Sequence, residues 1–520
     1  MSWRRGYDVV VIGSGPNGLA AAVALAAADL SVLVVEARAQ PGGGCRTSAL
    51  TEPGFLHDVC SAVHPLALAS PWFRALGLDR AVEWVQPPAA LAHVLPGGRV
   101  VTLERSIDET ALQLGRDAAA YRALMTPLAE RFGELLPMIL GPLRWPAAPL
   151  LMARFGVRAI RSLEGLAASL FRRPEAPALL GGIAAHAMVP LDRLATASFA
   201  LLLGLAGHVV GWPIVRGGAR GLTDALVARL HALGGELAVG ERIEHLAQLP
   251  TARAYVFDVA PRHLAAIAGD RLPASYRARL GRYRHGPGVF KIDWALRGPV
   301  PWLDDRCARA ATVHLSGDLA DLAAAERAVH AGSLAARPFT LFVQPTRFDP
   351  SRAPAGMHTA WAYCHVPAGA AIDATDAIEA HVEAFAPGFR DLVIARATMD
   401  PRQLAAYDPN YVGGDISGGL SDLRQLFFRP VVRLDPYATP APDVFLCSSS
   451  TPPGGGVHGM CGYHAARSVL ARVFGRRAPA LAPAAGYPRA STTMAASASA
   501  WSAANVARPI DSTTSPGSSA

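Results

Sequence analysis

Hydrophobic and polar positions near the start of the chain fall into blocks that predict a strand, a helix and a second strand. Residues 9–12 are four consecutive β-branched apolar residues, and an Ala- and Leu-rich stretch follows a short glycine turn. A second apolar run, residues 32–35, ends at the acidic Glu36. Short apolar runs bounded by glycines favour buried strands, whereas the longer Ala-rich stretch favours a helix. Residues 7–36 are therefore predicted to form a β-α-β unit.

The turn inside this unit has the glycine spacing of a dinucleotide-binding site. Its first glycine permits a tight turn, its second lets the backbone approach a pyrophosphate, and its third lets the helix pack closely on the strand. Free N–H groups at the helix N-terminus favour a bound diphosphate. Glu36 is predicted to accept hydrogen bonds from ribose hydroxyls, and an incidental glycine turn is the alternative. The residues predicted to hold a dinucleotide here are Gly13, Ser14, Gly15, Pro16, Asn17, Gly18 and Glu36.

Composition limits the class of protein. A length of 520 residues is enough for two or three domains. Hydrophobic residues make up 51% of the chain and charged residues 17%, which indicates an apolar ligand, a membrane-facing surface or simply an Ala-rich composition. The net charge of +8 comes from scattered arginines without a basic cluster interleaved with aromatics. Nucleic-acid binding is therefore not predicted.

Cysteine usage and the N-terminus indicate a compartment. The six cysteines are far apart and none forms a CxxC pair, which argues against a structural zinc, a disulfide scaffold and a redox-active disulfide. No metal site is predicted. Two arginines precede the first apolar run as in a secretory signal, but the glycine turn and Asp29 interrupt that run. We predict a cytoplasmic protein that is peripheral to the inner face of the membrane.

Two further glycine-rich stretches offer backbone N–H groups to a ligand. Residues 41–47, PGGGCRT, follow the second predicted strand and extend the phosphate cradle through Gly43, Gly44, Arg46 and Thr47. Near the other end, a strand at residues 443–446 leads through a Pro/Gly turn into a helix that begins near Gly459. That helix presents its N-terminus to an electron-rich partner. The candidate residues of this second motif are Gly455, Gly456, His458, Gly459 and Met460.

The motifs GSGPNG…VVEA and PGGGCRT resemble the FAD-binding start of the flavoprotein superfamily that includes phytoene desaturases and monoamine-oxidase-like enzymes. Residues 53–73 resemble the desaturase-like subgroup that contains pyridine nucleotide-disulfide oxidoreductase domain-containing protein 2. The resemblance implies FAD as cofactor, with Ala37 in the cradle and a backbone group near Ile243 at the adenine. It also implies that the final helix faces the flavin ring and raises its electron affinity.

The expected architecture is α/β, with a discontinuous Rossmann-type, glutathione-reductase-like FAD-binding domain and an inserted α+β substrate domain. The FAD-binding domain is predicted at residues 1–74, 216–285 and 441–476. The substrate domain is predicted at 75–215, as its helical part, and at 286–440, as its sheet. Residues 477–520, rich in Ala, Ser, Thr and Pro, are predicted to be a disordered tail. Residues 195–215 lack Asp, Glu, Lys and Arg and are predicted to be a buried helix rather than a transmembrane span.

Lys291 and His458 are the catalytic candidates. Lys291 is the only lysine in the chain, where 49 residues are Lys or Arg. In amine-oxidase-like relatives a strand of this pattern carries a lysine that faces flavin N5, which implies the same role for Lys291. A surface lysine paired with Asp293 is the alternative. His458 lies at the turn of the second motif, where a purely structural histidine is equally compatible with the sequence.

The predicted function is an FAD-dependent oxidoreductase that takes hydride from an apolar small molecule and desaturates a C–C bond of a polyene-like or lipid-like substrate. The electron acceptor is oxygen, a quinone or another molecule, because only one complete Rossmann fingerprint is present. Amine oxidation is the main alternative and would need an aromatic cage, for which Tyr363 and Tyr411 are candidates. A reduced-flavin isomerase and a non-catalytic FAD-containing interaction protein are also compatible with the sequence. Peripheral membrane contact is expected as well.

Overall fold

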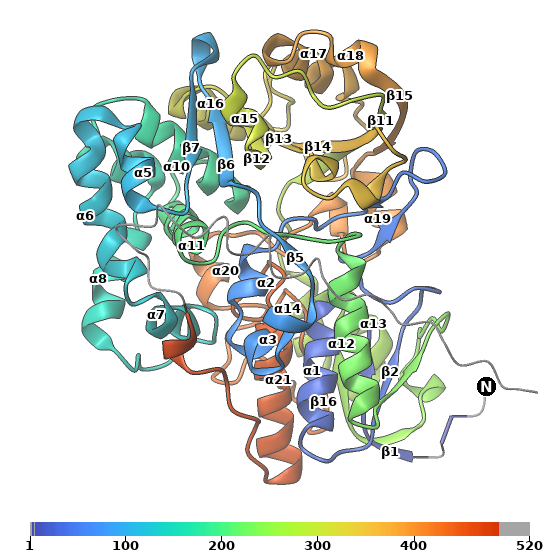
Figure 1. Cartoon of the computed structure of the whole chain (residues 1–520). Coiled ribbons are helices and arrows are strands. Elements are labelled where there is room, and N and C mark those ends of the chain that lie inside the picture. The colour runs from blue at the N-terminus through green and yellow to red at the C-terminus, as the bar shows by residue number, and fades with distance from the viewer. Residues whose placement is uncertain (1–2, 5, 488–520) are drawn as a thin grey trace, which may run out of the picture.

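The computed structural model describes residues 3–4 and 6–487, and one of its layers is a five-stranded parallel sheet (Figure 1). Its strands come from the beginning, the middle and the end of the chain, so the domain built on it is discontinuous. Across the sheet they are β16 (Val444–Leu446), β10 (Thr251–Phe257), β1 (Gly6–Ile12), β2 (Val32–Val35) and β9 (Glu236–Ala238).

Helices cover both faces of this sheet. Alternate residues of β1 point to opposite sides, with Val9 and Val11 in the core shared with α1 and α21, and Val10 and Ile12 in the core shared with α13 and α14. Burial on both faces explains why the strands read as unbroken apolar runs. The predicted Rossmann-type α/β fold is confirmed. The covering helices are α1 (Pro16–Ala26), α12 (Arg220–Ala232) and α21 (Met460–Val469) on one face and α13 (Pro261–Ala268) and α14 (Ala274–Gly281) on the other.

A seven-stranded sheet forms the second layer, at the top of Figure 1. All neighbouring strands are antiparallel except β12 and β6, which are parallel. Two strands come from residues 75–215, so the prediction that this segment is helical was wrong in part: the Ala-rich β6 is a strand because β12 pairs with it. In order the strands are β15 (Val393–Met399), β11 (Gly288–Leu296), β14 (His358–Val366), β13 (Thr340–Val343), β12 (Ala310–Leu315), β6 (Ala89–Val94) and β7 (Val100–Leu103).

The third layer is helical and lies at the left of Figure 1. Its central helix, α11, is the buried helix that the uncharged stretch at residues 195–215 predicted. None of the helices in the described part of the chain is long and apolar enough to span a bilayer. The layer comprises α5 (Ile107–Leu112), α6 (Ala118–Ala129), α7 (Phe132–Ile139), α8 (Pro149–Ala159), α9 (Leu163–Leu170), α10 (Glu175–Ala184) and α11 (Thr196–Val209).

The remaining elements include two longer helices, α16 and α17, that contact β14 of the seven-stranded sheet, and several shorter helices and strands. The strands among them form two small sheets, β3 with β4 and β5 with β8. These elements are β3 (Thr47–Ser48), β4 (His57–Asp58), β5 (Trp84–Val85), β8 (Ile214–Val215), α2 (Pro65–Ala69), α3 (Pro71–Ala75), α4 (Leu78–Ala81), α15 (Asp305–Ala308), α16 (Leu319–His330), α17 (Thr375–Phe385), α18 (Phe389–Leu392), α19 (Pro401–Tyr407) and α20 (Leu423–Phe427).

Residues 477–487 pack against the protein, which corrects the predicted start of the tail. The Tyr487 hydroxyl donates to the carbonyl of Ala69, its ring packs edge-on against Phe132, and the N–H of Ala482 donates to the carbonyl of Pro71. The low hydrophobicity of this segment gave no sign of these contacts in the sequence. One buried tyrosine and a few backbone hydrogen bonds are enough to hold the segment. The rest of the predicted tail, residues 488–520, lies outside the described residues.

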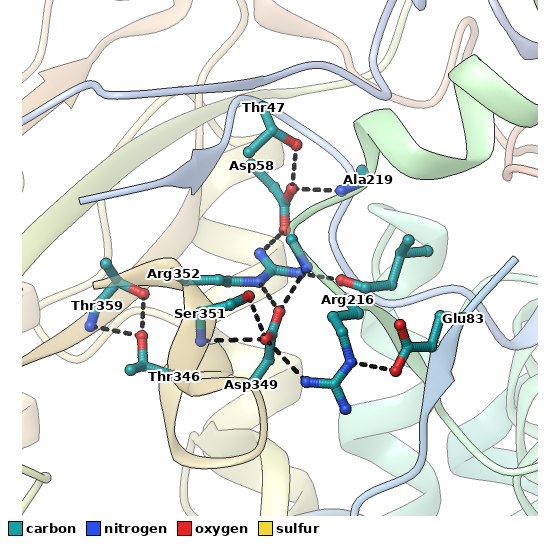
Figure 2. A network of polar contacts seen from close by, with 12 residues as sticks. Thr47, Asp58, Glu83, Arg216, Ala219, Thr346, Asp349, Ser351, Arg352 and Thr359 are labelled. Carbon is teal, nitrogen blue, oxygen red and sulfur yellow. Dashed lines mark hydrogen bonds and ion pairs between the residues drawn. The ribbon is translucent and has the colours of Figure 1, made fainter. Parts of the chain in front are cut away.

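A buried arginine joins three stretches of the chain near the dinucleotide-binding half (Figure 2). The Arg352 guanidinium pairs with Asp58 of β4 and with Asp349, and it donates to the carbonyl of Val215 at 2.6 Å. Arg352, Asp58 and Asp349 are at most 1% exposed. Thr47 donates to Asp58 at 2.9 Å within the same network. The Ala219 N–H of the middle segment also donates to Asp58 at 2.7 Å, so the network ties the first and middle segments of the dinucleotide-binding domain to the inserted domain.

Candidate active site

One cavity of about 1460 Å³ runs from the parallel sheet into the inserted domain. This volume exceeds that of an ordinary ligand pocket, about 300–1,000 Å³, so it has room for a cofactor and a substrate together. Both glycine motifs line one end of it. Of the sequence-predicted residues, those that line the cavity are Gly13, Ser14, Gly15, Pro16, Asn17, Glu36, Ala37, Gly43, Gly44, Arg46, Ile243, Gly455, Gly456 and His458.

Five predicted residues do not line the cavity: Gly18, Thr47, Lys291, Gly459 and Met460. Gly18 serves packing, since a Cβ there would lie 2.1 Å from the carbonyl oxygen of Gly13. Thr47 belongs to the Arg352 network. Gly459 and Met460 begin α21 just behind the lining residue His458.

The N-terminus of α1 faces the cavity without a capping side chain of its own. The carboxylate of Asp258, the residue after β10, takes its place by accepting from the Gly18 N–H at 2.8 Å. Burial raises the pKa of Asp258 to about 7, and the nearby carboxylates of Asp408 and Glu36 add to the effect although the Gly18 N–H opposes it. Sequence reasoning missed Asp258. The signal was an acid at the carboxyl end of a parallel strand, where ligands bind in such sheets.

Glu36 is buried and already accepts four hydrogen bonds from the chain. One oxygen accepts from the Ser14 N–H at 3.0 Å and its hydroxyl at 2.6 Å, and the other accepts from the Arg38 N–H at 2.9 Å and from Arg46 at 3.1 Å. A carboxylate offers about four acceptor positions. A ribose hydroxyl would therefore replace one of these donors.

The second motif brings α21 and His458 to the same cavity. The Met460 N–H donates to Nδ1 of His458 at 3.0 Å, so Nε2 carries the ring proton. Nε2 is buried and has no partner among the described residues. Burial lowers the pKa of His458 to about 4, partly offset by backbone groups of Gly455 and Gly454, so the ring is neutral. The arrangement presents an unused N–H donor beside the N-terminus of α21.

Lys291 lies one layer behind the cavity wall. It is 3% exposed, forms an ion pair with Asp293 on the same strand face, and has Nζ 5.3 Å from the ring centre of Trp361, which lines the cavity. The alternative interpretation, a lysine paired with Asp293, is right about the partner but wrong about the surface location. Residues two apart on a strand share a face, and a sheet strand buried on both sides keeps that pair from water.

The far arm of the cavity is apolar and comes from the helical layer and the inner face of the seven-stranded sheet. Tyr363 and Tyr411, the candidates for an aromatic cage, both line the cavity. The apolar wall includes Met138, Leu140, Met152, Phe155, Phe199, Leu202, Trp212, Leu341, Trp361 and Phe427.

Comparisons with known proteins agree with this geometry. A family model described as an NAD(P)-binding Rossmann-like domain matches residues 11–76. Pyridine nucleotide-disulfide oxidoreductase domain-containing protein 2 of Mus musculus is 25% identical, with 89% of this chain and 93% of the relative covered. Phytoene desaturase (lycopene-forming) of a Paracoccus species is 25% identical, with 87% and 95% covered. Putrescine oxidase bound to putrescine has the same fold, with a TM-score of 0.57, 17% identity and coverage of 90% and 99%.

The fold and these relatives define a flavin-type oxidoreductase. Over most of its length the chain is similar to a phytoene desaturase and to pyridine nucleotide-disulfide oxidoreductase domain-containing protein 2, and it shares its fold with an amine oxidase. The resemblance stated from the motifs is confirmed. The six cysteines are all free, so the word disulfide in the name of that relative has no counterpart in this chain.

Proposed function

We propose that the protein is an FAD-dependent dehydrogenase that desaturates a C–C bond of an apolar, polyene-like or lipid-like molecule. The observation that carries the proposal is one continuous cavity whose first end is built from glycine turns and two helix N-termini and whose far arm is apolar. A dinucleotide suits the first end. A long hydrocarbon suits the second.

The residues present fit FAD. Gly43 approaches Gly15 so closely that a Cβ on it would lie 3.0 Å from the Gly15 Cα, leaving backbone rather than side chains facing the ligand. Asn17 Oδ1 is buried without a partner in the described part of the chain, and His458 offers an unused N–H. Gly13 to Asn17 would hold the diphosphate, Glu36 and Ala37 the ribose, and Ile243 the adenine. FAD supplies the acceptor for the hydride when bound.

The chain's own residues orient the substrate and exclude water. Trp212, Trp361 and Phe199 form apolar walls that hold a hydrocarbon by dispersion and by removing it from water. The N-terminus of α21 and the His458 N–H favour negative charge at the cofactor end. We infer that Lys291 is a positioning residue that acts through Trp361. Its ammonium group, paired with Asp293, lies against the Trp361 ring and keeps that ring in place in the cavity wall.

The test is an absorbance spectrum followed by anaerobic reduction. Wild-type protein reconstituted with FAD is expected to show flavin bands that bleach with a polyene or an unsaturated acyl lipid and not with long-chain amines. Gly15→Val is expected to retain no flavin, since even a Cβ at Gly15 would lie 2.6 Å from Asp258 Oδ2. Gly281→Ala, where a Cβ meets open space, is the control and should bind FAD like the wild type.

Lys291→Met is measured in the same assay. We expect this variant to retain its flavin and the flavin to bleach more slowly than in the wild type. A wild-type protein that binds no FAD after reconstitution would contradict the proposal. Bleaching by amines alone would show that the protein is an amine oxidase and not a desaturase.

We also propose that the apolar substrate enters from a membrane at the face of α8. This α8 face consists of six exposed apolar residues and the arginines among them. Leu143 and Ile160 are exposed and also line the cavity, so the cavity opens there. Residues 141–161 contain four arginines and neither Asp nor Glu, which suits an anionic lipid surface. The exposed apolar residues are Leu143 (70%), Trp145 (87%), Leu150 (86%), Val157 (62%), Ile160 (48%) and Leu194 (54%).

Sedimentation with vesicles tests the α8 face. The wild type is expected to bind vesicles that contain phosphatidylglycerol, more weakly as salt rises, and Trp145→Ser with Leu150→Ser is expected to lose about tenfold or more in affinity. Val432→Ser with Leu434→Ser is the matched control, because those residues are 60% and 107% exposed outside the α8 face. Equal binding by both double variants would overturn the assignment of the α8 face.

A further inference from the structure

Three histidines, two of them fully buried, form a row that reaches the cavity. His93 of β6 lies opposite His314 of β12 in the parallel pairing, with ring centres 5.9 Å apart. Nε2 of His314 is 3.4 Å from Nε2 of His186, which lies in a short 3₁₀ turn after α10. His186 lines the cavity, whereas His93 and His314 are 0% exposed. The described residues contain no cluster of three or more His, Cys, Asp or Glu that could hold a metal ion, so metal binding does not account for the row.

The hydrogen bonds of the row assign its protons. Nε2 of His93 is 2.8 Å from the carbonyl of Gly317, which only accepts, so His93 carries its proton on Nε2 and a lone pair on Nδ1. Nδ1 of His93 and Nδ1 of His314 are buried and have no hydrogen-bond partner among residues 3–4 and 6–487. Both lie beside Gly182, where an added Cβ would lie 2.5 and 2.6 Å from them, so the two nitrogens are neighbours that do not form a hydrogen bond.

These constraints favour one set of tautomers. A proton on Nδ1 of His314 is favoured over a second lone pair beside the lone pair of His93, and it leaves Nε2 of His314 as an acceptor. His186 then donates from Nε2, and its Nδ1 keeps a lone pair. The backbone next to His186 is strained, because Met188, directly after the turn, has a φ of +55°, and its carbonyl accepts from His330 at 3.1 Å. Such strain in a non-glycine residue next to a cavity is typical of functional segments.

The surroundings keep the His186 ring neutral. It packs edge-on against Trp212 at 5.6 Å and near Phe339 at 6.5 Å. Burial lowers the pKa of His186 to about 3, and His365 beyond Phe339 adds to the effect. His365 itself pairs with the buried Glu326 at 2.6 Å. Burial also lowers the pKa of His93 to about 4 and that of His314 well below its ordinary value.

We propose that His186 is a catalytic base whose Nδ1 takes the proton lost by the substrate during desaturation, with His314 and His93 as positioning residues that keep this nitrogen unprotonated. This inference rests on the proposed dehydrogenase function. Removal of a hydride, with its two electrons, to the flavin leaves a cationic carbon in the substrate. The neighbouring C–H bond then breaks, its electron pair forms the new C=C bond, and the proton forms an N–H bond on His186.

A weakly basic imidazole suits this step. A C–H bond beside a cationic carbon is far more acidic than an imidazolium, so a strong base is unnecessary. A ring that resists protonation from solution stays available over the whole physiological pH range. Trp212 and Trp361 line the same cavity, and aromatic rings stabilise a neighbouring positive charge.

The first test needs neither cofactor nor substrate. FAD-free protein is treated with diethyl pyrocarbonate, which acylates unprotonated imidazole, and His186 is followed by peptide mass spectrometry. N-acetylhistidine in the same tube should lose about tenfold in reactivity between pH 8 and pH 5.5, whereas labelling of His186 should change less than about twofold. His93→Leu removes the lone pair that orders the row and should slow labelling of His186 in protein that still unfolds cooperatively. Absent labelling of His186, or labelling that falls with pH like the free compound, overturns the proposal.

The second test uses a compound that bleaches the bound flavin anaerobically. His186→Gln keeps a polar group for His314 but cannot take a proton at a comparable acidity, and we expect flavin reduction to slow by about 100-fold or more. His231→Gln, on the exposed side of α12, is the control. Wild-type rates in His186→Gln at full flavin content contradict the inference. If no compound reduces the flavin, the proposed function fails, while the labelling experiment still decides whether His186 presents a lone pair.

Discussion

Arg352→Met is expected to lower the free energy of unfolding by about 3–5 kcal/mol, the usual cost of breaking a buried ion pair by removing one partner. The guanidinium is 0% exposed and lies between the carboxylates of Asp58 and Asp349 (Figure 2). Methionine fills much of the volume but removes the cation that the two buried carboxylates share. Asp349 keeps the partly exposed Arg216 at 3.5 Å, whereas Asp58 keeps only neutral donors such as Thr47. Thermal and urea unfolding of the FAD-free protein measure the loss.

Two further variants separate charge from packing. Arg216→Met removes a side chain that is 43% exposed and is expected to cost at most about 1 kcal/mol. Adding Asp58→Asn to Arg352→Met should recover part of the loss, because it removes the carboxylate that has lost its counter-ion while the amide oxygen still accepts from Thr47. The electrostatic account is wrong if Arg352→Met unfolds like Arg216→Met, or if the added Asp58→Asn destabilises it further.

Asp258→Asn is expected to stabilise the protein increasingly as pH rises from 5 to 7. The folded pKa of about 7 exceeds the ordinary value of 3.8, so between these values the folded state holds a proton that the unfolded chain has lost. Folding stability of the wild type therefore falls as pH rises through this window, by about 4 kcal/mol in total. Asparagine keeps an acceptor for the Gly18 N–H but carries no charge. The gap between the two proteins should widen by about 2–3 kcal/mol between pH 5 and pH 7.

The same carboxylate predicts a pH dependence of cofactor binding. Above pH 7 the wild type would hold a negative charge beside the site proposed for the diphosphate, so FAD should bind more weakly at pH 9 than at pH 6. Asp258→Asn should remove most of that dependence. Asp270→Asn, at a fully exposed side chain, is the control and should follow the wild type at every pH. A constant difference between Asp258→Asn and wild type from pH 5 to pH 8 would show that Asp258 is already ionised throughout.

The cofactor end of the cavity was readable from local spacing. Strand, glycine turn and helix lie within 30 residues, and each glycine has a steric reason that holds wherever the unit folds. The second motif was readable for the same reason, since its strand, turn and helix are contiguous. Predictions for single side chains were less accurate. Thr47 and Lys291 were predicted to contact the cofactor. Their side chains instead bind Asp58 and Asp293, and neither residue lines the cavity.

Sequence alone determined the class of fold, the ends of the dinucleotide-binding unit and the apolar character of the chain, because these depend on contacts between residues close in sequence. Only the tertiary structure decided which distant groups meet. Asp258 reaches Gly18 across 240 positions, His314 pairs with His93 through a parallel strand, and Arg352 finds Asp58 from a different domain. Such contacts leave no periodic signal, since one polar residue among apolar neighbours looks the same whatever partner the fold brings to it.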